Sequence, residues 1–150
     1  MLPFEIKAIV AADTWFLRRL VLRPHLPLEE SRYPEDLTRK AIHMGVLVGG
    51  LIVGIASVYQ EDETGMTDNN VWRLRGMAIA PEVRGQGYGR RLLVEISKKT
   101  VEQGGSRIWC NARVTAVDFY KQQGFATHGE PFNLADIGAH YIMKKTLSGS

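Results

Sequence analysis

Cysteine is almost absent from this 150-residue chain, which contains only Cys110. A single cysteine cannot form an intramolecular disulfide, so the fold must be held by its core and a reducing compartment is allowed. We expect Cys110 to be a small buried hydrophobe rather than a nucleophile, because no base is predicted beside it. His25, His43 and His128 are scattered without the spacing of metal ligands, so we predict no metal.

Long apolar runs and a strong charge of one sign are also lacking. No stretch approaches the roughly 20 apolar residues of a membrane helix, and the first residues do not form a secretory signal. The formal net charge of +3 is too small to indicate nucleic acid as a partner. We therefore expect a cytoplasmic enzyme or binding protein with no membrane partner. At this length, and without a repeat or linker, we expect one domain over residues 1–150.

Strand and helix patterns alternate along the chain. Apolar and β-branched residues predict strands at 4–10, 41–48, 51–59, 71–80, 107–112, 125–128 and 139–145. Helical periodicity predicts helices at 13–22, 88–103 and 115–122 and a short helical turn at 34–40. Asp13 is the expected cap of the first helix, and Gly49-Gly50 is a hairpin turn. This order predicts an α/β fold with a mixed sheet that has antiparallel and parallel parts.

A glycine-rich loop, Arg84-Gly85-Gln86-Gly87-Tyr88-Gly89-Arg90-Arg91, lies between a predicted strand and the longest predicted helix. Glycines let the backbone turn tightly, and the first N–H groups of a helix have no internal partner, which together favour pyrophosphate binding. A Walker loop would end in Gly-Lys-Ser/Thr, and a dinucleotide fingerprint would have glycine at Arg90. Both interpretations fail, while a tight loop that only begins a helix stays open.

Three motifs follow one another along the chain: Arg84-x-x-Gly87-x-Gly89 after a strand, Phe119-Tyr120-Lys121-Gln122-Gln123-Gly124-Phe125, and the closing strand His140-Tyr141-Ile142-Met143. Together they resemble the GNAT superfamily of N-acetyltransferases. The order and spacing match over residues 71–145. The resemblance implies a GNAT-type fold, with a mostly antiparallel sheet and a splayed parallel strand pair flanked by helices, and acetyl-CoA as cofactor. The cofactor contacts that it implies are Met77, Ala78, Ile79, Arg84, Gly85, Gln86, Gly87, Tyr88, Gly89, Arg90 and Asn111.

The resemblance narrows to the glyphosate N-acetyltransferase group of bacterial enzymes. The matching stretches are Leu22-Arg23-Pro24, Leu74-Arg75-Gly76-Met77-Ala78, Trp109-Cys110-Asn111-Ala112-Arg113 and Gly138-Ala139-His140. In that group the matching arginines hold the acids of the acceptor, and the matching histidine and tyrosine lie at the chemistry. The substrate-binding residues that it implies are Arg23, Arg75, Arg113 and His140, with Tyr120 and His140 as catalytic residues. The implied reaction acetylates the amine of a small acidic acceptor.

The chemistry of acetyl transfer gives these residues definite roles. A phenol, with a pKa of about 10 against about 8.5 for a thiol, makes Tyr120 a candidate acid for the departing thiolate. The imidazole of His140 can take a proton from the ammonium, directly or through a phosphate or phosphonate of the acceptor. The resemblance implies a strand pair that splays to admit the thioester, and Gly76, in the middle of a strand, fits a bulge or a close backbone approach there. The N–H of Met77 or Ala78 can then stabilise an oxyanion.

Arg73 and Arg75 alternate with period two, so they lie on one face of their strand. The acidic tract Glu61-Asp62-Glu63 can pair with one of them, because arginine is rarely buried unpaired. Guanidinium groups add ~1.5–3 kcal/mol per charged hydrogen bond, so several of them would select a di-acid over a plain amine. Two alternatives stay open: a protein or peptide N-acetyltransferase of the same fold, and a non-catalytic acyl-CoA-binding sensor. The chain is expected to act as a monomer or a homodimer.

Overall fold

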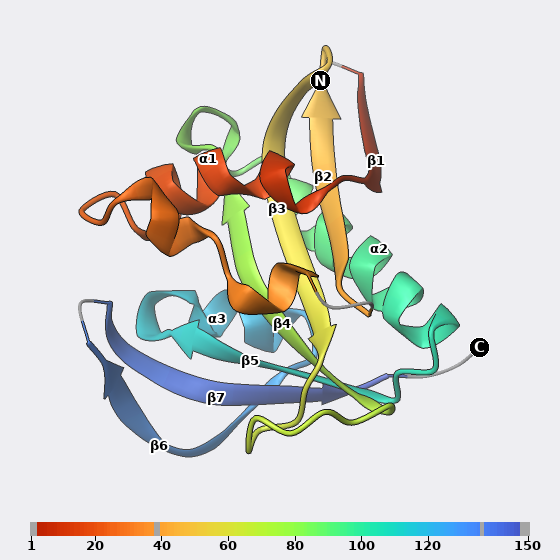
Figure 1. Cartoon of the computed structure of the whole chain (residues 1–150), viewed down its shortest axis with the longest axis vertical. Coiled ribbons are helices and arrows are strands. Elements are labelled where there is room, and N and C mark those ends of the chain that lie inside the picture. The colour runs from red at the N-terminus through yellow and green to blue at the C-terminus, as the bar shows by residue number, and fades with distance from the viewer. Residues whose placement is uncertain (1–2, 38–39, 136, 148–150) are drawn as a thin grey trace.

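The computed structural model describes residues 3–37, 40–135 and 137–147, and these build a seven-stranded sheet of order β1-β2-β3-β4-β5-β7-β6 (Figure 1). The strands are β1 Phe4–Ala8, β2 Ile42–Val48, β3 Leu51–Gln60, β4 Val71–Ile79, β5 Arg107–Arg113, β6 Ala126–Leu134 and β7 Gly138–Thr146. Neighbouring strands are antiparallel except for β4 and β5, which are parallel. The predicted mixed, mostly antiparallel sheet is confirmed.

Helices cover the sheet on both faces, with α1 in front of β3 and β4 and α2 behind β2 and β3 in Figure 1. The α-helices are α1 Trp15–Leu17, α2 Tyr88–Glu102 and α3 Val117–Gln122. Shorter helical turns are Ala11–Thr14, Leu28–Ser31, Pro34–Leu37, Pro81–Val83 and Val114–Ala116, all of the 3₁₀ type, and the π turn Arg18–Leu22. In the part of the chain described here, none of the helices has both the length and the apolar character needed to span a membrane.

The first predicted helix forms, but it is irregular. It runs from a 3₁₀ turn through α1 into the π turn, where the Arg23 N–H donates to the carbonyl of Arg18 at 3.1 Å. Asp13 as its cap is wrong, because the N-cap residue is Val10. The Asp13 carboxylate accepts a hydrogen bond from the Val10 N–H at 3.2 Å from within the first turn. The helical turn predicted at 34–40 is confirmed as far as Leu37, and residues 38 and 39 lie outside the described part.

The sixth strand is longer than predicted. An end at His128 is wrong, because β6 continues through Gly129 and Pro131 to Leu134, with its register against β7 shifting between His128 and Phe132. As an edge strand, β6 needs hydrogen-bond donors on one side only, so it tolerates a proline and a glycine with φ of +78°. The extension carries the chain back alongside His140, whose Cα is paired with that of Phe132.

Two apolar clusters form the core, one on each face of the sheet, and successive residues of β3 alternate between them. Ala56 and Val58 pack in the larger cluster with the buried face of α2, while Ile55 packs with Leu17 of α1 in a smaller cluster. The apolar residues of α2 recur every three to four positions, which places them along one side of the helix. Gly104, with φ of +93°, follows the helix and ends it.

Strand β4 contains a bulge at Gly76. Ile55 is paired with Ala78 while Ser57 is paired with Arg75, so two residues of β4 oppose one residue of β3. Gly76 has φ of +68°, a conformation that L side chains rarely adopt. The bulge predicted from the mid-strand glycine is therefore confirmed.

The bulge reverses which residues of β4 face α2. Trp72 and Leu74 belong to the larger cluster before the bulge, and Met77 packs against that cluster beyond it. Ala78 instead joins the smaller cluster on the α1 face. A regular strand would have kept its even-numbered residues on one side throughout.

The parallel pair separates soon after it begins. Strands β4 and β5 are paired only from Val71 to Arg73 and from Arg107 to Trp109, although β4 continues to Ile79 and β5 to Arg113. Figure 1 shows β4 running up the molecule while β5 crosses below it. The predicted splay is confirmed, and it opens the sheet at the carboxyl ends of both strands.

Candidate active site

The glycine-rich loop leads into the N-terminus of α2 with its backbone exposed. Gly85 and Gly87 have φ of +82° and +83°, and a Cβ on either would meet no atom within 4 Å. Gly87 is the N-cap residue, and its carbonyl accepts from the Arg91 N–H at 3.2 Å. The N–H groups of residues 88–90 therefore lie at the open end of the helix, where its dipole is positive.

Some side chains around this loop point to solvent and others into the core. Arg84 and Arg90 are exposed, and the Arg84 Nε donates to the carbonyl of Ile79 at 3.3 Å. Tyr88 is buried, with its ring 5.1 Å from that of Phe4, so its backbone rather than its side chain is available to a ligand. The loop therefore offers main-chain N–H groups flanked by guanidinium groups, which fits a pyrophosphate.

A cavity of about 160 Å³ lies where β4 and β5 separate. The predicted acceptor-binding and catalytic residues all line it: Arg23, Arg75, Arg113, Tyr120 and His140. Met77 and Asn111, both predicted near the cofactor, line it as well. Strands β4, β5 and β7, which are successive neighbours in the sheet, contribute residues to the cavity wall. Tyr120 of α3 and Leu22 of the π turn also contribute to that wall.

Tyr120 projects from α3 into the larger core cluster. Its ring makes edge contacts with Phe119 and Phe125 at centroid distances of 5.2 and 5.3 Å. Its hydroxyl lies 3.8 Å from the sulfur of Met77, next to the bulge. Burial raises the pKa of Tyr120 well above its usual value, so the phenol is protonated throughout the neutral range.

His140 lies on β7 and is 3% exposed. Its Nδ1 is 2.7 Å from the carbonyl oxygen of Gly138. A carbonyl can only accept, so Nδ1 carries the hydrogen and, in the neutral ring, Nε2 is left as the acceptor. This tautomer, assigned from the hydrogen bond, is the one that a proton-accepting role requires.

Arg75 leaves β4 just before the bulge and meets an acid. Its Nη1 lies 3.2 and 3.4 Å from the two carboxylate oxygens of Glu35, and its guanidinium carbon lies 3.8 Å from the centroid of the Tyr33 ring. Both ionic side chains are 24% exposed. Arg75 is thus held in place at the wall of the cavity.

The other two predicted arginines donate to main-chain carbonyls. Arg113 donates to the carbonyl of Leu22, and Arg23 donates to that of Glu30 at 3.3 Å. Burial lowers the pKa of Arg113, and the nearby charge of Arg23 lowers it further. Two guanidinium groups close enough to affect each other make an anion favourable between them.

Arg73 also lines the cavity, and its partner is the one expected from sequence. Its Nη1 lies 3.1 Å from a carboxylate oxygen of Glu61, and its guanidinium carbon lies 5.1 Å from the Trp109 ring centroid. Cys110 lies in the same wall and is buried, and burial raises the pKa of its thiol to about 12. Cys110 is therefore a buried apolar residue, as predicted, and not a nucleophile.

A buried ion pair behind the cavity has no counterpart among the sequence predictions. Arg18 is completely buried, and its two terminal nitrogens donate to the carboxylate of Asp36 at 2.6 and 2.9 Å. The same guanidinium reaches Ser57 at 2.9 Å and Tyr59 at 3.2 Å. Burial alone would raise the pKa of Asp36, but hydrogen bonds from Arg18 and Tyr59 outweigh it and lower that pKa. The sequence signal that could have indicated this buried polar cluster is the pair Ser57 and Tyr59, two polar side chains on the same face of an inner strand.

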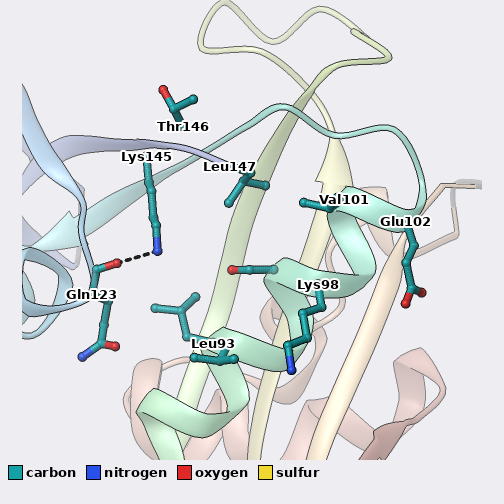
Figure 2. A pocket seen from close by; sticks show the side chains of 10 residues that line it. Leu93, Lys98, Val101, Glu102, Gln123, Lys145, Thr146 and Leu147 are labelled. Carbon is teal, nitrogen blue, oxygen red and sulfur yellow. Dashed lines mark hydrogen bonds between the residues drawn. The ribbon is translucent and has the colours of Figure 1, made fainter. Parts of the chain in front are cut away.

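A larger cavity, of about 510 Å³, lies elsewhere, between α2 and the end of β7 (Figure 2). Leu93, Val101 and Leu147 point toward it from both sides, and Lys145 donates to the carbonyl of Gln123 at 2.8 Å across one end. None of the predicted site residues lines it. Size therefore does not mark the site, whereas the polar groups around the smaller cavity do.

The Acetyltransferase (GNAT) domain family matches residues 28–147, which include the loop, the bulge and the residues that line the cavity, except Leu22 and Arg23. The chain belongs to the GNAT acetyltransferase family. It is 37% identical, over 97% of its own length and 98% of the relative, to an uncharacterized N-acetyltransferase, YitI, of Bacillus subtilis. The GNAT family uses acetyl-CoA as acyl donor, so the predicted superfamily, enzyme class and cofactor are confirmed.

Solved GNAT-like structures share the fold at low sequence identity. Escherichia coli ElaA superposes with a TM-score of 0.78 at 16% identity, covering 95% of this chain and 99% of that one. An aminoglycoside 6'-N-acetyltransferase complexed with coenzyme A gives 0.73 at 16% identity, with 95% and 96% covered. These likenesses confirm the GNAT fold of the chain.

Proposed function

We propose that this GNAT enzyme acetylates the amine of a small acidic acceptor, such as an amino acid, a phosphonate or a phosphate-bearing amine, as in the glyphosate N-acetyltransferase group. The observation that carries the proposal is the convergence of Arg23, Arg75 and Arg113 on the cavity that Tyr120 and His140 also line. Guanidinium groups bind carboxylates and phosphates through paired hydrogen bonds, and three of them favour an acceptor with more than one acid.

The size of the cavity supports a small acceptor. Its volume of about 160 Å³ is below the ~300–1,000 Å³ typical of sites for drug-sized ligands. A protein or peptide N-acetyltransferase is the alternative, but the ammonium of a lysine or of a chain end would have to pass several guanidinium groups. That arrangement repels cations and so favours the small acid.

The cofactor contacts follow from the backbone. We propose that N–H groups of the loop from Arg84 to Arg90 bind the pyrophosphate of acetyl-CoA. Beyond the bulge, Met77, Ala78 and Ile79 face the splay with the edge that β5 leaves unpaired, so an extended arm can pair with them there. Asn111, on the opposite side of the splay, is placed to contact that arm from β5.

Acetyl-CoA supplies the acetyl group and, as its thiolate, the leaving group. Tyr120 is the proposed acid: its high pKa keeps the hydroxyl protonated, so it donates a hydrogen bond to the sulfur and passes the proton only as negative charge builds there. His140 is the proposed base, because Nε2 is the free acceptor of the ring and can take a proton from the ammonium of the acceptor. An N–H at Met77 or Ala78, beside the bulge, is the proposed oxyanion donor.

The proposal is tested by measuring thiol release from acetyl-CoA with a panel of acceptors. The panel contains an aminophosphonate, phosphoserine, aspartate, a neutral amine and a short peptide. We expect the acids to have the highest kcat/KM. Preference for the neutral amine or the peptide would refute the acidic acceptor, and tight binding of coenzyme A without any turnover would favour the sensor.

The role of Arg75 is tested in the same assay. Arg75→Ala is expected to raise KM for the preferred acid by about tenfold or more, as expected for loss of a charged hydrogen bond. KM for acetyl-CoA should not change. Arg107→Ala is the matched control, because Arg107 pairs with Glu63 at 3.1 Å and does not line the cavity. Equal effects of the two substitutions would contradict the assignment.

A further inference from the structure

Glu35 places a carboxylate on the arginine that the acceptor is proposed to use. Its two oxygens lie 3.2 and 3.4 Å from Nη1 of Arg75, and both side chains are 24% exposed. Glu35 lies on the turn Pro34–Leu37, across from the bulged part of β4. An acidic group of the acceptor that reaches Arg75 would thus find the guanidinium already paired with a carboxylate, that of Glu35.

The partners of the three acceptor arginines are unequal. Arg23 and Arg113 donate to main-chain carbonyls, which have no charge to neutralise theirs. Among the described residues, Arg23 also lies 4.0 Å from a carboxylate oxygen of Glu30. Within the described part of the chain, Arg75 is the one of the three with a carboxylate at hydrogen-bonding distance. A first anionic group can therefore bind Arg23 and Arg113, whereas a second must compete with Glu35 for Arg75.

The neighbours of Glu35 hold it firmly. Tyr33 stacks on Arg75 at 3.8 Å and on Arg18 at 3.9 Å, measured from guanidinium carbon to ring centroid. Asp36 is bound by the buried Arg18. A carboxylate flanked on both sides by anchored residues loses little freedom when it pairs with Arg75, so this ion pair is better placed than an average surface pair.

We propose that Glu35 is a specificity-determining residue, an internal carboxylate that the second acidic group of the acceptor must displace from Arg75. The inference rests on the proposed function. Acceptors with one acid bind Arg23 and Arg113 and leave Glu35 in place. Acceptors with two acids gain Arg75 as well, at the expense of the Glu35 contact. Glu35 therefore determines how much an acceptor gains in affinity from its second acidic group.

The test compares Glu35→Gln with the wild-type enzyme. Glutamine keeps the shape of the side chain and removes its charge, so Arg75 becomes available. We expect KM for phosphoserine, which has two acids, to fall by about fivefold, while KM for serine, which has one, changes by less than about twofold. KM for acetyl-CoA is expected to stay constant. Glu63→Gln is the control, since Glu63 pairs with Arg107 and Lys144 at 3.1 Å outside the cavity.

A binding measurement separates this inference from the proposed function. Succinate has two acids and no amine, so its calorimetric affinity is independent of turnover, and it should bind Glu35→Gln about fivefold more tightly than the wild type. An unchanged or weaker affinity would overturn the role of Glu35, and a higher KM for phosphoserine would instead assign it to the ammonium of the acceptor. If the wild type acetylated only neutral amines, the proposed function would fail. The succinate affinities would still show whether Glu35 competes with an anionic ligand for Arg75.

Discussion

Substitution of Arg18 by methionine should weaken both the fold and the acceptor site. Arg18 is completely buried and joins the π turn to β3 and to the turn that contains Asp36. Methionine has a similar length and no charge, so it leaves Asp36 buried without its cation. The segment that carries Tyr33 and Glu35 also loses its anchor, and KM for the acceptor should rise while KM for acetyl-CoA is kept.

The magnitude follows from what remains around Asp36. Removal of one member of a buried ion pair costs ~3–5 kcal/mol, because the other charge stays buried. Asp36 keeps hydrogen bonds from the Tyr59 hydroxyl at 2.7 Å and the Tyr33 N–H at 3.2 Å, which favours the lower limit of about 3 kcal/mol. For a chain of this length the melting temperature should fall by roughly 6–12 °C. A domain of this size is stable by several kcal/mol more than that and should still fold.

Urea unfolding followed by circular dichroism measures this loss. Arg107→Met is the control: it breaks the 3.1 Å ion pair with Glu63 at a partly exposed site, and it should cost less than about 1 kcal/mol. The double variant Arg18→Met/Asp36→Leu should be more stable than Arg18→Met alone, because it leaves no lone charge. The reasoning would be refuted if Arg18→Met and Arg107→Met lowered the free energy of unfolding equally. It would also be refuted if the double variant lost as much as Arg18→Met and Asp36→Leu lose separately when added together.

Three further substitutions test other parts of the structure. Tyr120→Phe should lower kcat by about 100-fold with acceptor KM kept, and full activity in steady-state assays would exclude Tyr120 as the acid. Burial lowers the pKa of His43 in the folded protein. As the pH drops below about 6.5, the histidine is therefore protonated in the unfolded chain before it is protonated in the folded one, and the free energy of unfolding should fall. His43→Asn should flatten that slope between about pH 7 and 5 in urea titrations, and an unchanged slope would contradict this. Gly76→Ala should cost about 2–3 kcal/mol, because its Cβ adds a 3.0 Å contact with Arg18 to the strain of positive φ. Gly85→Ala has the strain without the contact, so a loss as large as that of Gly76→Ala would show that strain alone accounts for both.

Features that depend on a few consecutive residues were predictable from the sequence. Gly49-Gly50 forms its hairpin turn, and Gly87 and Gly76 adopt the left-handed conformations that a loop and a bulge require. The apolar repeat of α2 and the alternation of the inner strands defined the main elements for the same reason, since each is a short-range periodicity. Element ends such as that of β6 were less predictable, because an edge position in the sheet decides whether Pro131 can be tolerated.

The set of residues that share the site depended partly on resemblance and partly on tertiary structure. The matching stretches pointed to Arg23, Arg75 and Arg113, but their partners were not visible in the sequence. The acidic tract was expected to pair with one of Arg73 and Arg75, and it is Arg73 that pairs with Glu61, whereas the partner of Arg75 is Glu35, far away along the chain.

By itself the sequence determined the loop, the mid-strand glycine and the mixed order of strands and helices, because backbone conformation and periodicity are local properties. Only the tertiary structure decided that Arg18 is buried against Asp36 and that Glu35 lies on Arg75. Those contacts depend on the strand register and on how the segment between α1 and β2 crosses the sheet. Both are set by burial and by hydrogen bonds between residues distant in the sequence, which no local pattern specifies.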